Sequence, residues 1–156
     1  MYKILFVCSG NTCRSPLAEA LLTKYVNEDE ALKDNVIVSS CGISAHFESL
    51  AEPNAITAGQ KFGVDLSSHK SHQFAEELLD LFDVVICVTK AHRDTLQKYF
   101  PEKKDKVFAL YEYLTGEKDC KNVADPFGGD LAAYEKIAGE LNEAVKQMVP
   151  MIKKNI

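Results

Sequence analysis

The junction between the first apolar segment and the helix expected after it constrains this chain more than any other feature. Residues 3–16 read KILFVCSGNTCRSP: an apolar run ends at Cys8, and Arg14, Ser15 and Pro16 stand where a helix can begin. This order predicts a thiol at the carboxyl end of a strand, facing backbone amides and a helix N-terminus. Both features favour negative charge, and so favour a thiolate with an anion beside it. The chemistry expected there is cysteine-dependent hydrolysis of a phosphoester or phosphoramidate.

The other apolar runs are short and alternate with helix-like segments. Strands are expected at residues 4–7, 36–39, 84–88 and 107–109, and helices at residues 16–27, 53–62, 73–81 and 90–100. Nearly continuous apolar strands separated by helices are typical of a parallel sheet covered on both faces. We therefore expect an α/β fold: a single three-layer domain over residues 1–156, with a four-stranded parallel sheet flanked by helices on both faces and the Cys-x5-Arg loop after the first strand. Ligands of such sheets bind beyond the carboxyl ends of the strands, where Cys8 falls.

A long helix is expected near the C-terminus, with Asp130 as its N-cap. Pro150 is expected to kink or end its regular part near Val149. One face of this helix carries an apolar stripe, which is expected to pack into the protein core; packing against a second copy of the chain in a dimer is the alternative. Its apolar residues recur at steps of three and four: Leu131, Tyr134, Ala138, Leu141, Val145, Met148 and Ile152.

Composition and cysteine spacing limit the partners, cofactors and cellular location that are expected for this protein. The 18 Lys and Arg residues are outnumbered by 23 Asp and Glu without a basic stripe, so no nucleic-acid partner is expected. No apolar run approaches membrane-spanning length, so no membrane partner is expected either. The 5 cysteines lack paired CxxC spacing, which argues against a disulfide framework or a zinc site, and neither metal nor cofactor is expected. A nucleophilic thiol needs a reducing compartment, so we expect a cytoplasmic location.

Each residue of the first loop is given a role by its chemistry. Cys8 attacks phosphorus as a thiolate and forms a thiophosphate intermediate, while the planar fork of Arg14 grips two phosphoryl oxygens. Gly10 permits close approach and unusual dihedrals, and Asn11 tolerates a left-handed backbone. Ser15 either caps the helix or donates its hydroxyl to the thiolate. The residues expected to cradle the phosphate are Ser9, Gly10, Asn11, Thr12, Cys13, Arg14 and Ser15.

A proton donor for the leaving group is expected from the segment VADPFGG at residues 123–129. Asp125 is the candidate acid, because Pro126 biases it away from helical geometry and the glycines let the backbone turn into the last helix. Alone, an Asp-Pro-x-Gly string is usually only a turn. A Cys-x5-Arg spacing alone is also compatible with Cys8 as a buried, unreactive thiol and Arg14 as a surface charge. The two segments together favour catalysis.

These residues resemble those of the low-molecular-weight protein tyrosine phosphatases over essentially the whole chain. The loop at residues 8–16 and the late pair Asp125-Pro126 sit at the ends where that family keeps them. The resemblance implies Cys8 as nucleophile, Arg14 as phosphate clamp, and Asp125 as acid and then as base for the attacking water. It also implies residues that shape and buffer the loop: Asn11, Ser15, Ser40 and His69. For the histidine of this set, the alternative is an ordinary loop residue bonded to backbone.

Several positions depart from the tyrosine-specific members of that family. Thr12 replaces a larger aliphatic residue, Thr89 replaces an acidic one, and Phe127 and Gly128 replace tyrosines after the Asp-Pro pair. The features that look more like the bacterial protein arginine phosphatases, a branch of the same family, are Thr12, Thr89 and residues 106–116 and 125–129. Phosphorylated protein side chains are therefore the expected substrates, with phosphoarginine favoured over phosphotyrosine. Inorganic phosphate or sulfate is expected to bind in the loop.

Two positions offer a physical reason why phosphoarginine would be preferred over phosphotyrosine. The compact hydroxyl of Thr12 leaves room and a polar partner for a guanidinium, whereas a bulky aliphatic residue packs against a tyrosine ring. The absence of an aromatic residue at Gly128 removes a wall for that ring. The alternative is that Thr12 is a neutral variation.

The resemblance also implies that Cys13 forms a reversible disulfide with Cys8 under oxidation, which would protect the nucleophile. Cys13 as a small buried residue that fills space under the loop is compatible with that role. Two other functions remain as alternatives. One is an arsenate reductase that passes oxidation through Cys87 and Cys120, and the other is a module that binds a phosphorylated residue without turnover.

Overall fold

Parallel strands form a sheet at the centre of the protein, in the order β2-β1-β3-β4. The computed structural model describes residues 1–156. The strands are β1 (Tyr2–Cys8), β2 (Val36–Gly42), β3 (Val84–Cys87) and β4 (Val107–Ala109). Each neighbouring pair is parallel, so the α/β fold and the four-stranded parallel sheet expected from the sequence are confirmed.

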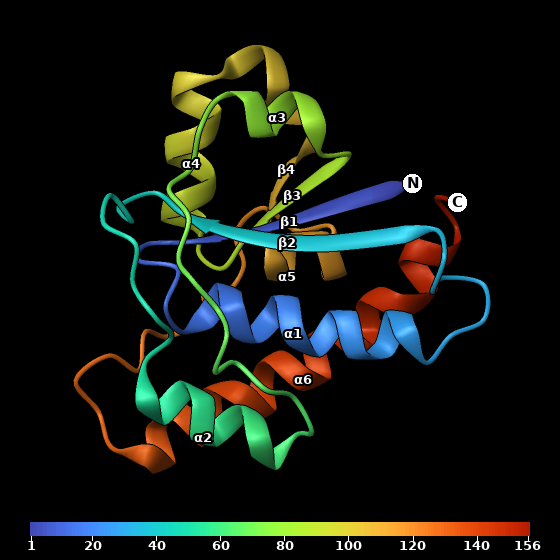
Figure 1. Ribbon diagram of the computed structural model, residues 1–156. Coiled ribbons are helices and arrows are strands. Elements are labelled where there is room, and N and C mark those ends of the chain that lie inside the picture. Colours follow the sequence, from blue (N-terminus) through green and yellow to red (C-terminus); the bar gives the residue numbers. More distant parts are fainter.

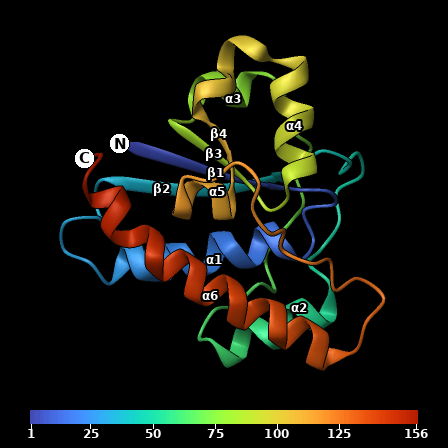
Figure 2. The same cartoon turned by 180° about the vertical axis from the view of Figure 1, so that it is seen from behind.

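Helices cover both faces of this sheet (Figure 1, and Figure 2 from behind). One face carries α1 (Arg14–Asn27), α2 (Pro53–Lys61), α5 (Leu110–Thr115) and α6 (Leu131–Lys153). The other carries α3 (Glu77–Leu81), α4 (Lys90–Tyr99) and the 3-10 helix η1 (Pro101–Lys106). None of the helices combines the length and the apolar composition needed to cross a bilayer.

The alternation of side chains along β1 divides the core in two and fixes the direction of the thiol. Ile4, Phe6 and Cys8 pack with residues of α1, α2 and α6, whereas Leu5 and Val7 pack with residues of α3 and α4. Successive residues of a strand face opposite sides of the sheet, so a shift of one residue would turn every side chain over. The thiol of Cys8 therefore lies on the α1 side, at the last residue of its strand.

Helix α6 is confirmed as a core element and differs from the expectation at its end. Asp130 caps it, since its Oδ1 accepts a hydrogen bond from the Ala133 N–H at 3.0 Å. Its apolar stripe is buried, apart from the half-buried first residue, and packs closest against α1 and α2. Of the two outcomes expected at Pro150, an end of the helix near Val149 is wrong, because α6 continues through Pro150 to Lys153. The missing N–H of a proline removes one helical hydrogen bond, and the buried side chains of Met148 and Ile152 hold the turn.

The helix expected at residues 73–81 forms only over Glu77–Leu81. The reason is the side chain of Gln73, which accepts a hydrogen bond from the Ala45 N–H at 2.6 Å and donates one to the Ile43 carbonyl at 2.7 Å. These tertiary bonds, with an isolated parallel bridge to Gly42, keep the segment extended. The short elements η1 and α5 were not predicted.

Candidate active site

The nucleophile candidate lies at the start of the phosphate loop (residues 8–15), which joins β1 to the first turn of α1. The Sγ of Cys8 lies 2.8 Å from the Oγ of Ser15 and accepts a hydrogen bond from the Asn11 N–H at 3.3 Å. The side-chain amide of Asn11 donates to the same Oγ at 2.7 Å, and the Ser15 hydroxyl also donates to the Cys41 carbonyl at 3.4 Å. The capping alternative for Ser15 is wrong, because Ser15 lies inside α1, whose N-cap is Cys13. The Asn11 N–H thus donates to the sulfur, and the Ser15 hydroxyl contacts it.

Asn11 is the centre of the hydrogen bonds that hold the phosphate loop. It has the only positive φ of a non-glycine residue, 55°, as expected, and it is fully buried. Its side-chain amide donates to the Oγ of Ser40 at 2.9 Å, and its Oδ1 accepts from the His72 N–H at 2.9 Å. The Nε2 of His69 lies 2.8 Å from the Asn11 carbonyl oxygen. His69 is thus a histidine bonded to backbone, and that backbone belongs to the phosphate loop. Gly10, in contrast, does not adopt a left-handed conformation.

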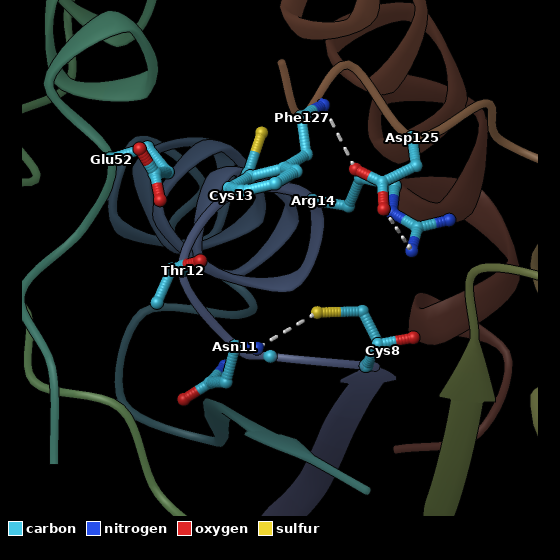
Figure 3. Close-up of a pocket in the computed structure, with 10 residues that line it drawn as sticks. Cys8, Asn11, Thr12, Cys13, Arg14, Glu52, Asp125 and Phe127 are labelled. Atoms are coloured by element: carbon cyan, nitrogen blue, oxygen red, sulfur yellow. Dashed lines mark hydrogen bonds and ion pairs between the residues drawn. The ribbon is translucent and has the colours of Figure 1, made fainter. Parts of the chain in front are cut away.

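Arg14 and Asp125 come together from opposite ends of the chain (Figure 3). The Nη1 of Arg14 donates to the Val123 carbonyl at 3.0 Å, and its Nη2 lies 3.6 Å from the Oδ2 of Asp125. Asp125 belongs to the acid loop (residues 123–129), and its Oδ1 accepts a hydrogen bond from the Phe127 N–H at 3.1 Å. The Arg14 side chain is 7% exposed and that of Asp125 is 54% exposed. The guanidinium is therefore fixed in the wall, while the carboxylate faces solvent above it.

These residues enclose a cavity of about 210 Å³. In Figure 3, Thr12 and Glu52 lie on one side of it, and Phe127 and Asp125 lie on the other. Gly128 has a φ of 82° in the turn and does not line the cavity. The lining residues are Cys8, Ser9, Gly10, Asn11, Thr12, Cys13, Arg14, Glu52, Asp125 and Phe127.

Glu52 is a lining residue that the sequence did not point to. It directly precedes α2, and its N–H donates to the Thr12 carbonyl at 2.9 Å. A single glutamate before a proline carries no signal of such a role. Only the fold brings residue 52 beside residue 12.

Cys13 differs from Cys8 in its ionisation. Burial raises the pKa of the Cys13 thiol to about 12, and the negative charges of Cys8, Asp125 and Glu52 add to this effect, against a smaller opposing effect of Arg14. Cys13 is therefore a protonated thiol at neutral pH. Both cysteines are free in this structure.

A hydrogen-bonded chain on α4 reaches the phosphate loop from the other side. The Nε2 of His92 lies 2.8 Å from the Oγ of Ser9, and its Nδ1 lies 2.7 Å from the Oγ1 of Thr89, which also caps α4. Burial lowers the pKa of His92 to about 4, and the charge of Arg14 lowers it further while Asp125 opposes it. His92 is therefore neutral at neutral pH. Of these residues, Thr89 was singled out in the sequence for its position, and the connection from Thr89 through His92 to Ser9 is seen only in the fold.

No three His, Cys, Asp or Glu side chains come together as metal ligands would. The groups that line the cavity are two thiols, an arginine, two carboxyl groups, polar side chains and the backbone of the phosphate loop.

Comparison with known proteins assigns this constellation to a family. A family model for low molecular weight phosphotyrosine protein phosphatases matches residues 3–156. A protein-arginine-phosphatase of Bacillus subtilis is 41% identical over 152 residues, which cover 97% of each chain. A probable low molecular weight protein-tyrosine-phosphatase, EpsP, of Ralstonia nicotianae is 33% identical, with 96% of this chain and 95% of the relative covered.

A solved structure agrees with these relatives. The YwlE arginine phosphatase, as a cysteine-to-serine mutant with a phosphorylated active-site serine, matches with a TM-score of 0.88 at 40% identity, and the match covers 97% of this chain and 96% of that one. Because the family model spans both the phosphate loop and the acid loop, this chain belongs to the low-molecular-weight phosphotyrosine protein phosphatase family.

Proposed function

We propose that this phosphatase removes the phosphoryl group from phosphoarginine side chains of proteins, with residues 1–156 acting as one catalytic unit. The observation that carries the proposal is the convergence of Cys8, Arg14 and Asp125 on one cavity, with the Arg14 and Asp125 side chains 3.6 Å apart. A nucleophile, a cationic clamp and a proton donor are the groups that phosphoryl transfer through a covalent enzyme intermediate requires.

In the first step, the thiolate of Cys8 attacks phosphorus as the bond from phosphorus to the leaving nitrogen breaks. Asp125, in its protonated form, gives its proton to that nitrogen, and the arginine side chain leaves as a guanidinium. The negative charge on the phosphoryl oxygens is met by Arg14 and by amides of the phosphate loop, which are already in place before the reaction. We assign the amides of residues 9–14 to this cradle, where inorganic phosphate or sulfate would also bind.

In the second step, the Asp125 carboxylate takes a proton from a water that attacks the phosphocysteine. The bond from sulfur to phosphorus breaks, inorganic phosphate leaves, and the thiolate is restored with Ser15 and the Asn11 N–H as its hydrogen-bond donors. We assign Ser40 and His69 to loop support, since both hold Asn11.

The preference for phosphoarginine is supported by the walls of the cavity. Thr12 lines it and presents a compact hydroxyl, and the carboxyl group of Asp125 has one oxygen to accept a hydrogen bond from a substrate nitrogen while the other protonates the leaving nitrogen. The most similar curated relative named above is itself a protein-arginine-phosphatase. Phe127 is 72% exposed at the rim, where its ring offers a flat surface to either a guanidinium or a tyrosine ring. That surface favours neither substrate, and phosphotyrosine stays the alternative because the family also contains tyrosine-specific relatives.

The structure offers little support to an arsenate reductase relay. Cys87 is buried with Leu5 and Val7, whereas Cys8 packs with the α1 side of the sheet. Burial strongly raises the pKa of Cys87, which opposes its use as a nucleophile. The same argument weighs on the redox role proposed for Cys13, since its raised pKa slows attack on an oxidised Cys8.

The cytoplasm is the proposed location, because a thiolate nucleophile is kept reduced there. The test of the function is kcat/KM on matched phosphoarginine and phosphotyrosine peptides, with Cys8→Ser as the blank. A strong preference for phosphoarginine that Thr12→Ile weakens supports the proposal. A preference for phosphotyrosine overturns it in favour of the tyrosine-specific branch. Phosphate binding without turnover of either peptide would leave a phosphoresidue-binding module.

A further inference from the structure

Glu52 places a second carboxylate at the wall of the cavity, opposite Asp125. The hydrogen bond from the Glu52 N–H to the Thr12 carbonyl, 2.9 Å long, holds its backbone against the phosphate loop. Its side chain lies beside Thr12 and Cys13 in Figure 3 and makes no hydrogen bond or ion pair within the protein. It does not cap α2 either, although it occupies the N-cap position. A half-buried carboxylate without a partner at the wall of a binding cavity is available to a ligand.

The charges of Glu52 and Asp125 act on the same space. Both raise the pKa of Cys13, which lies between them in Figure 3, and both raise the pKa of the buried Tyr134. A group that enters the cavity toward Cys8 therefore passes between the carboxyl groups of Glu52 and Asp125. The positive charge of Arg14 lies in the wall near the bottom, where the phosphoryl group is held.

We propose that Glu52 accepts hydrogen bonds from the unphosphorylated nitrogens of the substrate guanidinium, opposite Asp125, and is a specificity-determining residue. This inference rests on the function proposed above. Phosphorylation of one terminal nitrogen of arginine leaves a second terminal nitrogen and Nε as donors in one plane. Carboxylates match that planar arrangement, and a charged partner makes such hydrogen bonds roughly twice as strong as neutral ones.

The same carboxylate disfavours phosphotyrosine. A phenyl ring offers it no N–H donor and no positive charge, so the repulsion between the carboxylate and the phosphoryl group, which a guanidinium offsets in phosphoarginine, stays uncompensated in phosphotyrosine. Specificity that combines attraction of one substrate with repulsion of another is more robust than either alone. Glu52 supplies both effects from one position.

The test is kcat/KM of wild type, Glu52→Gln and Glu52→Asp on a phosphoarginine peptide, on small N-acetylated phosphoarginine and on a phosphotyrosine peptide. Glu48→Gln is the matched control, because Glu48 is exposed in the same loop and its loss changes the net charge equally. For Glu52→Gln we expect a loss of about tenfold on both phosphoarginine substrates, the size of one charge-assisted hydrogen bond. On phosphotyrosine we expect no loss, and for Glu52→Asp a smaller loss than for Glu52→Gln.

Three outcomes would overturn the inference while the proposed function stands. Equal losses on phosphoarginine and phosphotyrosine would indicate a structural role. A loss on the peptide but not on the small compound would indicate a contact with a neighbouring residue of the substrate. An equal effect of Glu48→Gln would indicate net charge alone. A wild type that itself prefers phosphotyrosine would instead overturn the proposed function, and the inference with it.

Discussion

The phosphate loop and the acid loop meet at one cavity and are held in different ways. In the phosphate loop, Asn11, Ser15 and Cys8 are buried and bonded to one another and to β2. In the acid loop, Val123 is buried and bonded to Arg14, whereas Asp125 and Phe127 are exposed and bonded only within the loop and at the edge of Arg14. One loop is fixed from all sides, and the other is fixed at its beginning.

This difference corresponds to two chemical tasks. A phosphoryl group has the same shape in every substrate, so a rigid cradle binds it with no reorganisation during the reaction. A leaving group differs between substrates and must receive a proton at its own position. An exposed carboxylate beside a fixed arginine is suited to that task. Substitutions of buried residues in the phosphate loop should therefore affect both activity and stability, and those of the exposed residues Asp125 and Phe127 in the acid loop should affect activity alone.

The largest effect is expected at the clamp. Arg14→Lys keeps the charge and loses the planar fork, so one ammonium would have to serve both the phosphoryl oxygens and the Val123 carbonyl. We expect kcat to fall by about 10³-fold, the upper range for removal of a preorganised donor in a reaction of this kind. Steady-state kinetics on the phosphoarginine peptide measure this, with circular dichroism as the control for folding. A folded variant with more than a tenth of wild-type kcat would contradict the assignment of the clamp.

The next largest effect is expected in the acid loop. Asp125→Asn removes the proton donor, and we expect kcat to fall by about 10²-fold on substrates whose leaving group must be protonated. On p-nitrophenyl phosphate the loss should be much smaller, because its leaving group departs as an anion. The side chain is 54% exposed, so the free energy of unfolding should change by less than about 0.5 kcal/mol. Equal losses on both substrates would argue that Asp125 acts on binding and not on proton transfer.

Stability should separate the two loops most clearly at Asn11 and Phe127. Asn11→Ala leaves the buried Ser40 hydroxyl and the His72 N–H without their partner and puts alanine at a φ of 55°. We expect it to lower the free energy of unfolding by about 3 kcal/mol, whereas Phe127→Ala should change it by less than about 0.5 kcal/mol. Urea denaturation measures both.

A second variant at Asn11 divides the loss between backbone strain and lost hydrogen bonds. Asn11→Gly adopts a positive φ without strain, so the difference between the glycine and alanine variants reports the strain of about 1 kcal/mol. If Asn11→Ala and Phe127→Ala were equally mild, the contrast between a fixed and an exposed loop would be lost.

The sequence predicted those parts of the molecule whose contacts are local or periodic. The position of Cys8 and Arg14 at one cavity was predicted because one continuous run carries strand, loop and helix, while their catalytic roles stay predictions. The buried stripe of α6 was predicted because it repeats. Glu52 and His92 were missed, because each meets the phosphate loop through a single tertiary contact that leaves no pattern in the chain. The helix predicted at residues 73–81 was longer than α3 for the same reason. The side-chain hydrogen bonds of Gln73 hold the start of this segment outside the helix and override its local helical preference.

The smallest effect concerns α4, which touches both loops. His92 bonds to Ser9 of the phosphate loop, while the nearby Lys90 N–H donates to Asn122 just before the acid loop. The pKa of His92 is lowered to about 4 in the folded protein from an ordinary value of 6.5, with Arg14 and Asp125 as the charges that face it. Between these pH values the unfolded chain binds a proton that the folded protein does not. This difference in proton binding therefore leaves the free energy of unfolding unchanged above pH 6.5 and lowers it increasingly as the pH falls toward 4.

His92→Gln removes this titration, so its stability should fall less than that of wild type between pH 6.5 and pH 4. We expect the difference to reach about 1 kcal/mol, because the partly solvated ring reduces the full linkage. Urea denaturation at several pH values measures it, and His46→Gln, at an exposed histidine, is the matched control. If the free energy of unfolding changed with pH in the same way in wild type and in His92→Gln, the imidazole of His92 would be protonated beside Ser9 with little loss of stability. In that case α4 would hold the phosphate loop no more firmly than the acid loop, and burial of the loop from the α1 side alone would have to account for its rigidity.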